Sequence, residues 1–352
     1  MKSMKNEPVK IGLVGLNFGA GMADSYIFNQ PAEKFVKIVA VCDLNREKAY
    51  DYAAKHQLPV FYGFDELLKN SEIEAILLMT PPFGRAKLIR KCIAAGKHVL
   101  TTKPFELDPD EALSVLLDAR EKNIIIHLNS PAPLPSSDLA KIREWIQKYD
   151  LGRPVSGDWE TYAMYNEKAD GSWLDFPEKC PVAPIFRLGI YGINELTAIM
   201  GEVEDVEIVS SRIRTGRPTP DNAKILIKFK NGAIGSVYAA LCIGDGRLYP
   251  AALTLHFEHG TITKVQERDA GTSKFDKLSL HLRALAEGKI IKEECSLSPS
   301  SRSGSYQFDN FYYAVRNGRS ADEIEPEVIA AGIRAISKMA KKEKESENVQ
   351  LK

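Results

Sequence analysis

The chain has 352 residues, of which 44% are hydrophobic and 27% are charged. These shares are those of a packed globular protein, and the length suggests two domains. Lysine plus arginine and aspartate plus glutamate both number 47, so there is no basic excess to neutralise phosphates, and nucleic-acid binding is excluded from the expected functions.

The sequence also argues against a membrane, secreted or metal-binding protein. No uncharged apolar run approaches the roughly 20 residues of a bilayer-spanning helix, and Met1–Glu7 contains no apolar segment typical of a secretory signal. The five cysteines are odd in number and widely spaced, and the six histidines show no metal-ligand spacing. We therefore expect a cytoplasmic protein with reduced thiols, no metal and no membrane partner.

The first half of the chain alternates short apolar runs with longer amphipathic segments. The expected strands are Val9–Val14, Val36–Cys42, Ala75–Met79, His98–Thr101 and Ile124–Leu128. The expected helices are Ala20–Asn29, Arg46–His56, Phe64–Lys69, Arg85–Ala95 and Asp110–Lys122. Strands that are apolar throughout are buried on both faces, and helical crossovers imply a parallel sheet. We predict an α/β fold with an N-terminal, doubly wound Rossmann domain over residues 1–130.

The pattern changes after the proline-rich stretch that begins at Ser130. A helix capped by Ser136 or Ser137 is expected first, and alternating polar and apolar residues then predict strands with a tight turn at Asn231-Gly232. Two helices, Tyr306–Asn317 and Pro326–Lys341, close the chain. Residues 131–352 are therefore predicted to form an α/β domain with an open mixed or antiparallel sheet. A free sheet face favours a homo-oligomer formed through this C-terminal sheet.

A glycine-containing segment follows the first strand, where a dinucleotide pyrophosphate would need bare backbone N–H groups. It contains Gly15, Asn17, Phe18, Gly19 and Ala20. The second glycine of the usual Gly-x-Gly-x-x-Gly/Ala pattern is replaced by Asn17, which tolerates left-handed backbone angles better than most residues. We predict that these residues bind the cofactor.

Two further regions at the carboxyl ends of strands are predicted to contact the cofactor. Asp43 ends the second strand, where a carboxylate accepts hydrogen bonds from ribose hydroxyls and favours NAD over NADP; the alternative is that Asp43 caps the following helix. Arg46 nearby leaves NADP open. Thr80 and Pro81 follow the third expected strand, at the edge where cofactors lie in doubly wound sheets.

The residues resemble the Gfo/Idh/MocA oxidoreductases, the family of glucose–fructose oxidoreductase and inositol dehydrogenase. The resemblance covers nearly the whole chain. It rests on Gly15–Ala20, Val41-Cys-Asp43, Thr80-Pro81, Ala94-Ala-Gly-Lys-His-Val-Leu100, Lys103-Pro104, Gly189-Ile-Tyr-Gly-Ile-Asn194 and Met200-Gly-Glu-Val203. It implies a Rossmann domain followed by an α/β domain with an open sheet.

The resemblance also implies a catalytic site. The family's Glu-Lys-Pro motif, whose lysine approaches nicotinamide and substrate, is matched by Thr102-Lys103-Pro104 without the acid. The family's Asp-x-Gly-x-His element is matched by Arg187-Leu-Gly189-Ile-Tyr191, with tyrosine at the histidine position as in related sugar dehydrogenases. Lys103 and Tyr191 are therefore the predicted catalytic pair. Lys103 is also predicted to contact cofactor and substrate, and Asn129 and Arg187 are predicted to bind substrate.

The chemistry of these groups is consistent with hydride transfer. An unperturbed tyrosine titrates near 10, so Tyr191 would need a cation, and Lys103 is the natural one. Arg187 either binds a substrate carboxylate or phosphate, which would favour acidic sugars, or pairs with Asp175 or Glu178.

The predicted function is NAD(P)-dependent hydride transfer between nicotinamide and a hydroxyl of a sugar, polyol or sugar acid. Two alternatives remain. One is an enzyme with tightly bound NAD that oxidises its substrate transiently and cleaves a glycosidic bond by elimination. The other is a non-catalytic, nucleotide-binding regulatory protein, for which the substitutions at Asn17, Thr102 and Arg187 are the argument.

Overall fold

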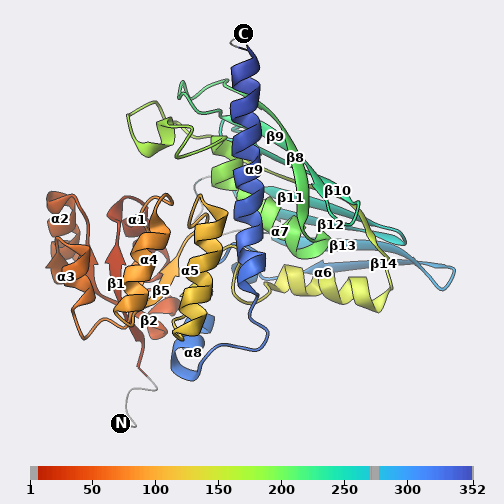
Figure 1. The fold of residues 1–352 in the computed structure, drawn as a ribbon. Helices are drawn as coiled ribbons and strands as arrows, with labels where there is room; N and C mark the ends of the chain where they lie inside the picture. The colour runs from red at the N-terminus through yellow and green to blue at the C-terminus, as the bar shows by residue number, and fades with distance from the viewer. Residues whose placement is uncertain (1–6, 270, 272–276, 351–352) are drawn as a thin grey trace. The chain divides into compact units, whose positions relative to one another are not determined.

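The computed structural model describes residues 7–269, 271 and 277–350, and the chain forms two compact units (Figure 1). The first unit comprises Met1–Glu106, Asp110–Leu134 and Tyr306–Pro326. The second comprises Leu107–Pro109, Pro135–Ser305 and Glu327–Lys352. Assignment of cofactor and substrate domains to residues 1–130 and 131–352 stays a prediction. The expected absence of a secretory signal depends on Met1–Glu7. Residues 1–6 of this segment lie outside the described part of the chain.

The first unit is built on a six-stranded parallel sheet of order β3-β2-β1-β4-β5-β6. Its strands are β1 (Val9–Val14), β2 (Val36–Cys42), β3 (Val60–Phe61), β4 (Ala75–Leu78), β5 (His98–Thr101) and β6 (Ile126–His127). The strand order reverses between β1 and β4, which makes this edge the topological switch point. The predicted parallel sheet is confirmed. The two-residue strand β3 was missed because it is too short to show an apolar run.

Helical crossovers join these strands: α1 (Leu16–Tyr26), α2 (Arg46–His56), α3 (Phe64–Leu68), α4 (Arg85–Ala94) and α5 (Pro109–Glu121). The expected start of the first helix at Ala20 was wrong, because α1 begins at Leu16. Gly15 turns the chain with φ +88°, and a carboxylate oxygen of Asp43 accepts the Leu16 N–H at 2.7 Å. The Gly15 turn and the Asp43 hydrogen bond start the helix four residues earlier than expected. Its first turns therefore contain Asn17, Phe18, Gly19 and Ala20.

A segment from near the C-terminus completes the first unit. Helix α8 (Phe308–Asn317) buries Phe308, Phe311 and Ala314 in the core of the parallel sheet. Arg316 then pairs with Glu74 at 2.5 Å. A helix was expected at this place in the chain and is confirmed. The core that it joins was not predictable, because its apolar face fits the core of either unit.

The second unit is built on an eight-stranded mixed sheet of order β14-β13-β12-β11-β7-β10-β9-β8. Its strands are β7 (Pro154–Tyr162), β8 (Val203–Ser211), β9 (Asn222–Phe229), β10 (Ile234–Ala240), β11 (Ala251–Phe257), β12 (Gly260–Glu267), β13 (Lys277–Ala286) and β14 (Lys289–Ser296). Strands β7 and β10 pair in parallel and the remaining neighbours are antiparallel. The expected turn at Asn231-Gly232 joins β9 to β10, with Gly232 at φ +89°.

Helices cover one face of this sheet (Figure 1). They are α6 (Ser137–Lys148), α7 (Ile190–Met200) and α9 (Pro326–Gln350), and a π-helical turn, Ile185–Gly189, leads directly into α7. On the other face, alternate side chains such as Leu226 are exposed. The predicted open mixed sheet is confirmed. Within the described part of the chain, no helix is both long enough and apolar enough to cross a bilayer.

Candidate functional site

The turn between β1 and α1 requires glycine on two grounds. Gly15 has φ +88°, and a Cβ atom there would lie 2.8 Å from the carbonyl carbon of Met79. A Cβ atom on Gly19 would lie 3.0 Å from a Leu13 methyl group and 3.1 Å from the Met79 Cβ. The first turn of α1 is therefore pressed against the carboxyl ends of β1 and β4, with its backbone N–H groups at the switch-point edge.

We expect Gly15→Ala to weaken both folding and cofactor binding. Positive φ for a residue with a side chain costs about 1–3 kcal/mol, and the clash with Met79 would displace the turn. Urea unfolding and fluorescence titration with NADH measure the two effects. Gly21→Ala is the matched control, because Gly21 is an exposed residue of α1 with no atom within 4 Å of the added Cβ. Equal behaviour of the two variants would contradict the prediction.

Asp43 links the ends of β2 and β1. One carboxylate oxygen accepts the Leu16 N–H and the other accepts the Asn45 N–H at 2.8 Å. Asn45, not Asp43, is the N-cap of α2, because its side chain accepts the Lys48 N–H at 3.0 Å. Each carboxylate oxygen has a second lone pair, so both remain able to accept ribose hydroxyls. Ribose binding by Asp43 stays a prediction.

Basic side chains stand near the same edge. The Lys48 ammonium donates to the side-chain oxygen of Asn17, and the Arg46 guanidinium lies 5.1 Å from the centre of the Tyr62 ring. Phe18 is 56% exposed, so its ring is available for contact. These cations are compatible with NADP as well as NAD.

The residues at this edge fit a dinucleotide. Backbone N–H groups at the start of α1 suit a pyrophosphate, and a cradle that a Cβ atom would fill lies at Gly15. The Thr80 hydroxyl is buried and has no hydrogen-bond partner among the described residues, so a polar cofactor group would satisfy it. Pro81 beside it is exposed.

A buried arginine connects the loops that follow β4 and β5. The Arg85 guanidinium is 2% exposed and donates to the carbonyl oxygens of Thr80, of Thr102 at 2.7 Å and of Pro104 at 3.2 Å. It also reaches the Thr101 hydroxyl at 3.3 Å. Burial lowers the pKa of Arg85 to about 10, which leaves it charged at neutral pH. Arg85 therefore holds the Thr80 loop and the Lys103 loop in fixed spacing.

We expect Arg85→Lys to lower kcat/KM by about 100-fold, because an ammonium cannot reach all of these oxygens and a displacement of about 1 Å has this cost. Steady-state kinetics at varied NAD and varied substrate measure the effect. Arg90→Lys is the control on the same helix, where the side chain is 35% exposed and paired with Glu111 and Asp118. A less stable Arg85→Lys enzyme with unchanged kcat/KM would show that Arg85 has only a structural role.

Asn129 holds the backbone of the predicted catalytic lysine. Its side-chain oxygen accepts the Lys103 N–H at 3.1 Å and the Thr102 hydroxyl at 3.2 Å, and Asn129 is 3% exposed. These contacts place Asn129 and Lys103 together in the first unit. Contact of Asn129 with a substrate stays a prediction; its observed role is to fix the Thr102–Lys103 loop.

Tyr191 lies at the start of α7 in the second unit, directly after the π-helical turn. Its ring lies against Gly304, where an added Cβ atom would be 2.8 Å from the ring carbon Cε1. The neighbouring Ser303 N–H donates to Asp138 at 3.1 Å, and Asp138 pairs with buried Lys264 at 2.9 Å. Lys264 also pairs with Glu195, one turn after Tyr191 on α7. This buried triad, Asp138–Lys264–Glu195, thus supports the segment beside the predicted catalytic tyrosine.

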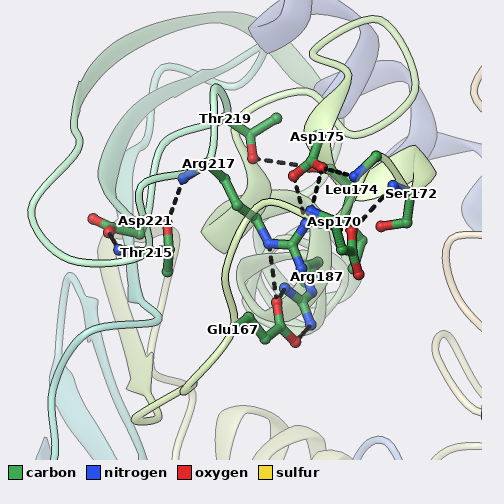
Figure 2. A network of polar contacts seen from close by, with 11 residues as sticks. Glu167, Asp170, Ser172, Leu174, Asp175, Arg187, Thr215, Arg217, Thr219 and Asp221 are labelled. Atoms are coloured by element: carbon green, nitrogen blue, oxygen red, sulfur yellow. Dashed lines mark hydrogen bonds and ion pairs between the residues drawn. The ribbon is translucent and has the colours of Figure 1, made fainter.

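Arg187 pairs with Glu167, which was not among its expected partners. Figure 2 shows its guanidinium facing Glu167, with both carboxylate oxygens engaged at 2.7 and 2.8 Å. Asp175 pairs instead with Arg217 at 2.5 Å. The expected alternative of an internal pair is therefore realised with Glu167 rather than with Asp175 or Glu178. Binding of a substrate anion by Arg187 stays a prediction and would require Glu167 to move.

Comparison with known proteins decides the family. A model described as an oxidoreductase family with an NAD-binding Rossmann fold matches residues 9–130, and the Gfo/Idh/MocA C-terminal domain matches residues 139–263. The chain belongs to the Gfo/Idh/MocA oxidoreductase family. As a member, it has an NAD-binding domain formed by the first of these segments. Among the described residues, no group of three or more His, Cys, Asp or Glu side chains is placed to hold a metal ion.

Three known proteins illustrate what the chain is similar to. Trans-1,2-dihydrobenzene-1,2-diol dehydrogenase of Sus scrofa is 28% identical over 222 residues, which are 58% of this chain and 59% of that protein. An NAD-binding oxidoreductase from Klebsiella pneumoniae has a TM-score of 0.70 at 20% identity, covering 95% of this chain and 96% of that one. Levoglucosan dehydrogenase in complex with NADH and levoglucosan has a TM-score of 0.72 at 19% identity, covering 96% and 98%.

Proposed function

We propose that the protein is an NAD(P)-dependent dehydrogenase or reductase that acts on a secondary hydroxyl, or the corresponding carbonyl, of a sugar or polyol. The observation that carries the proposal is the switch-point edge of the first unit. There the Gly15 turn, the Asp43 carboxylate and the Lys103 loop are held by named contacts in a Rossmann sheet. Relatives named for a diol and for levoglucosan support a hydroxylated substrate.

When bound, NAD would supply a hydride acceptor for the carbon that bears the substrate hydroxyl. Asp43 would bind the adenosine ribose, and the Gly15 turn with the first residues of α1, from Leu16 to Ala20, would bind the pyrophosphate. Tyr191 accepts the proton of the substrate hydroxyl, so that the carbon–oxygen bond becomes a carbonyl as the carbon–hydrogen bond breaks. The role proposed for the Lys103 ammonium, on the loop after β5, is to contact the nicotinamide and the substrate oxygen.

The two alternatives make different predictions. A family member that oxidises its substrate transiently and eliminates at a glycosidic carbon returns the cofactor to its starting state. It therefore releases no net NADH. A regulatory protein would bind the dinucleotide without turnover. We favour net oxidoreduction because Lys103 and Tyr191 are both present and the Lys103 loop is fixed by Asn129 and Arg85.

The test is a dehydrogenase panel on the purified full chain. Neutral sugars, inositols and the matching uronic acids are each offered with NAD⁺ and with NADP⁺, and formation of the reduced cofactor is followed by absorbance. We expect net reduction of the cofactor with at least one neutral sugar or polyol. Cofactor binding without turnover on any member, in either direction, would favour the regulatory alternative; failure to bind either dinucleotide would overturn the proposal.

We also propose a homo-oligomer formed through the free face of the eight-stranded sheet. Leu226 and Ile234 lie diagonally on adjacent strands of this face and are 57% and 59% exposed in the single chain. We expect Leu226→Glu to shift the molar mass measured by light scattering toward that of one chain. Val209→Glu on neighbouring β8 is a second variant of the same face, and an unchanged mass in both would contradict the proposal. A cytoplasmic location stays a prediction.

A further inference from the structure

We propose that Glu167 determines substrate specificity: by filling the guanidinium fork of Arg187, it makes the enzyme select uncharged sugars or polyols over sugar acids. This inference rests on the proposed function and names its substrate class. A planar guanidinium is suited to bind a substrate carboxylate, but here a carboxylate of the chain itself already occupies the fork of Arg187.

Two neighbours, Tyr165 and Arg217, contact the Arg187–Glu167 pair. Arg187 engages Glu167 through both terminal nitrogens, at 2.7 and 2.8 Å, and its guanidinium carbon lies 4.5 Å from the centre of the Tyr165 ring. The Arg217 Nε lies 3.5 Å from the Glu167 oxygen that accepts from Arg187 at 2.7 Å (Figure 2). Glu167 is therefore shared by two arginines, and the orientation of the fork is fixed before any substrate arrives.

The charges of this network disfavour an incoming anion. Arg187 and Arg217 carry two positive charges, while Glu167, Asp170 and Asp175 carry three negative ones. Burial raises the pKa of Glu167, but its hydrogen bonds with Arg187 hold that pKa below its ordinary value, so Glu167 is ionised at neutral pH. A sugar carboxylate would meet a net negative group whose arginines are already paired.

The location relates the pair to the chemistry. Arg187 lies in the π-helical turn, Ile185–Gly189, and Tyr191 follows four residues later in α7. The turn that carries Arg187 therefore leads directly into the helix that carries Tyr191, and π-helical turns recur at functional sites. The Arg187 side chain is 17% exposed and that of Glu167 is 29% exposed, so the pair is accessible from solvent.

Glu167→Gln provides the test, because glutamine has nearly the same shape but no charge. Arg187 would then face a neutral amide at position 167, and a substrate carboxylate would gain a charge-assisted hydrogen bond worth a factor of about 10 to 100 in kcat/KM. The substrates are D-glucose and D-glucuronate, D-galactose and D-galacturonate, which differ only at C6. We expect the ratio of kcat/KM for acid over neutral sugar to rise by this factor relative to the unchanged enzyme.

Two variants control the measurement. Glu258→Gln removes a carboxylate that also holds an arginine, Arg153 at 2.7 Å, at the end of β11, and should leave the ratio unchanged. Glu167→Gln combined with Arg187→Met should lose the gain, because the cation that binds the acid is gone. Glu167→Ala carries the same test if the glutamine variant fails to fold.

The outcomes separate this inference from the proposed function. Calorimetric binding of D-glucuronate and D-glucose to the protein saturated with NADH gives the acid preference even without turnover. An unchanged enzyme that prefers the acids, or a Glu167→Gln ratio equal to that of Glu258→Gln, overturns the role of Glu167. If no variant reduces NAD⁺ or NADP⁺ with any sugar, the proposed function fails, and the binding ratio alone decides the role of Glu167.

Discussion

Tyr191→Phe should lower kcat for the oxidation of the best sugar or polyol by about 100- to 10,000-fold, the usual contribution of a positioned acid or base. The change removes the phenolic oxygen that is proposed to accept the substrate proton. The ring that lies against Gly304 is retained, so the packing at the start of α7 should not change. The loss should therefore appear in kcat, with NADH binding close to that of the unchanged enzyme.

Steady-state rates, NADH titration and thermal unfolding on the same preparation test this prediction. Tyr313→Phe is the matched control, since Tyr313 is 52% exposed on α8. A Tyr191→Phe enzyme with the rate of the Tyr313→Phe enzyme would show that another group moves the proton. A variant that has lost NADH binding or stability along with activity would show that the phenol acts on the fold.

Periodicity was sufficient to predict the architecture. The strands β1, β2, β4 and β5 are mostly apolar and mostly buried in a parallel sheet, and such strands carry a strong signal because residues facing both sides contribute to it. The start of α1 could not be predicted in the same way. It depends on the Asp43 carboxylate, which lies 27 residues from the Leu16 N–H that it accepts.

The site could be predicted from the sequence only at positions where the residue type itself indicates the role. Gly15 was predictable because it directly follows an apolar strand, and it has a positive φ. Lys103 and Tyr191 were predicted from the resemblance to the family. Arg85 and Glu167 were missed as functional residues because their partners are distant in sequence. Arg85 binds backbone oxygens up to 19 residues away, and Glu167 pairs with Arg187 at a separation of 20.

The partner of Arg187 was predicted wrongly because it too is distant in sequence. Asp175 and Glu178 are nearer to Arg187 along the chain than Glu167 is. Arg217 arrives from the segment between β8 and β9 and takes Asp175, which leaves Arg187 to pair with Glu167. Competition between two arginines for the same carboxylates is a tertiary effect that no local pattern contains.

Lys264→Met should destabilise the protein by about 3–5 kcal/mol, because removing one member of a buried ion pair leaves its partners charged in a site without water. Burial alone would lower the pKa of Lys264, but Asp138 and Glu195 raise it above its ordinary value, so the lysine is charged in the folded protein. Its side chain is 2% exposed, and that of Asp138 is 1% exposed. Methionine keeps the length and the apolar stem, so the loss reflects the charge.

The effect should depend on pH in a defined direction. Burial is the main influence on Glu195 and raises its pKa, whereas Lys264 outweighs burial at Asp138 and lowers that pKa. Without Lys264, both carboxyls should titrate at higher pH than in the unchanged protein. The Lys264→Met defect should therefore shrink as the pH falls and the two carboxyls take up protons, and it should be largest at neutral and alkaline pH.

Urea unfolding at several pH values measures this defect, with Lys228→Met as the control. Lys228 also pairs with a carboxylate, Glu204 at 2.9 Å, but its side chain is 59% exposed, and such surface pairs contribute about 0–1 kcal/mol. Lys264→Met combined with Asp138→Asn and Glu195→Gln should recover part of the loss, because no uncompensated charge remains. Equal stability of the Lys264→Met and Lys228→Met proteins would mean that water reaches the Asp138–Lys264–Glu195 triad. Asp138 could then no longer be assigned the role of fixing Ser303 beside Tyr191.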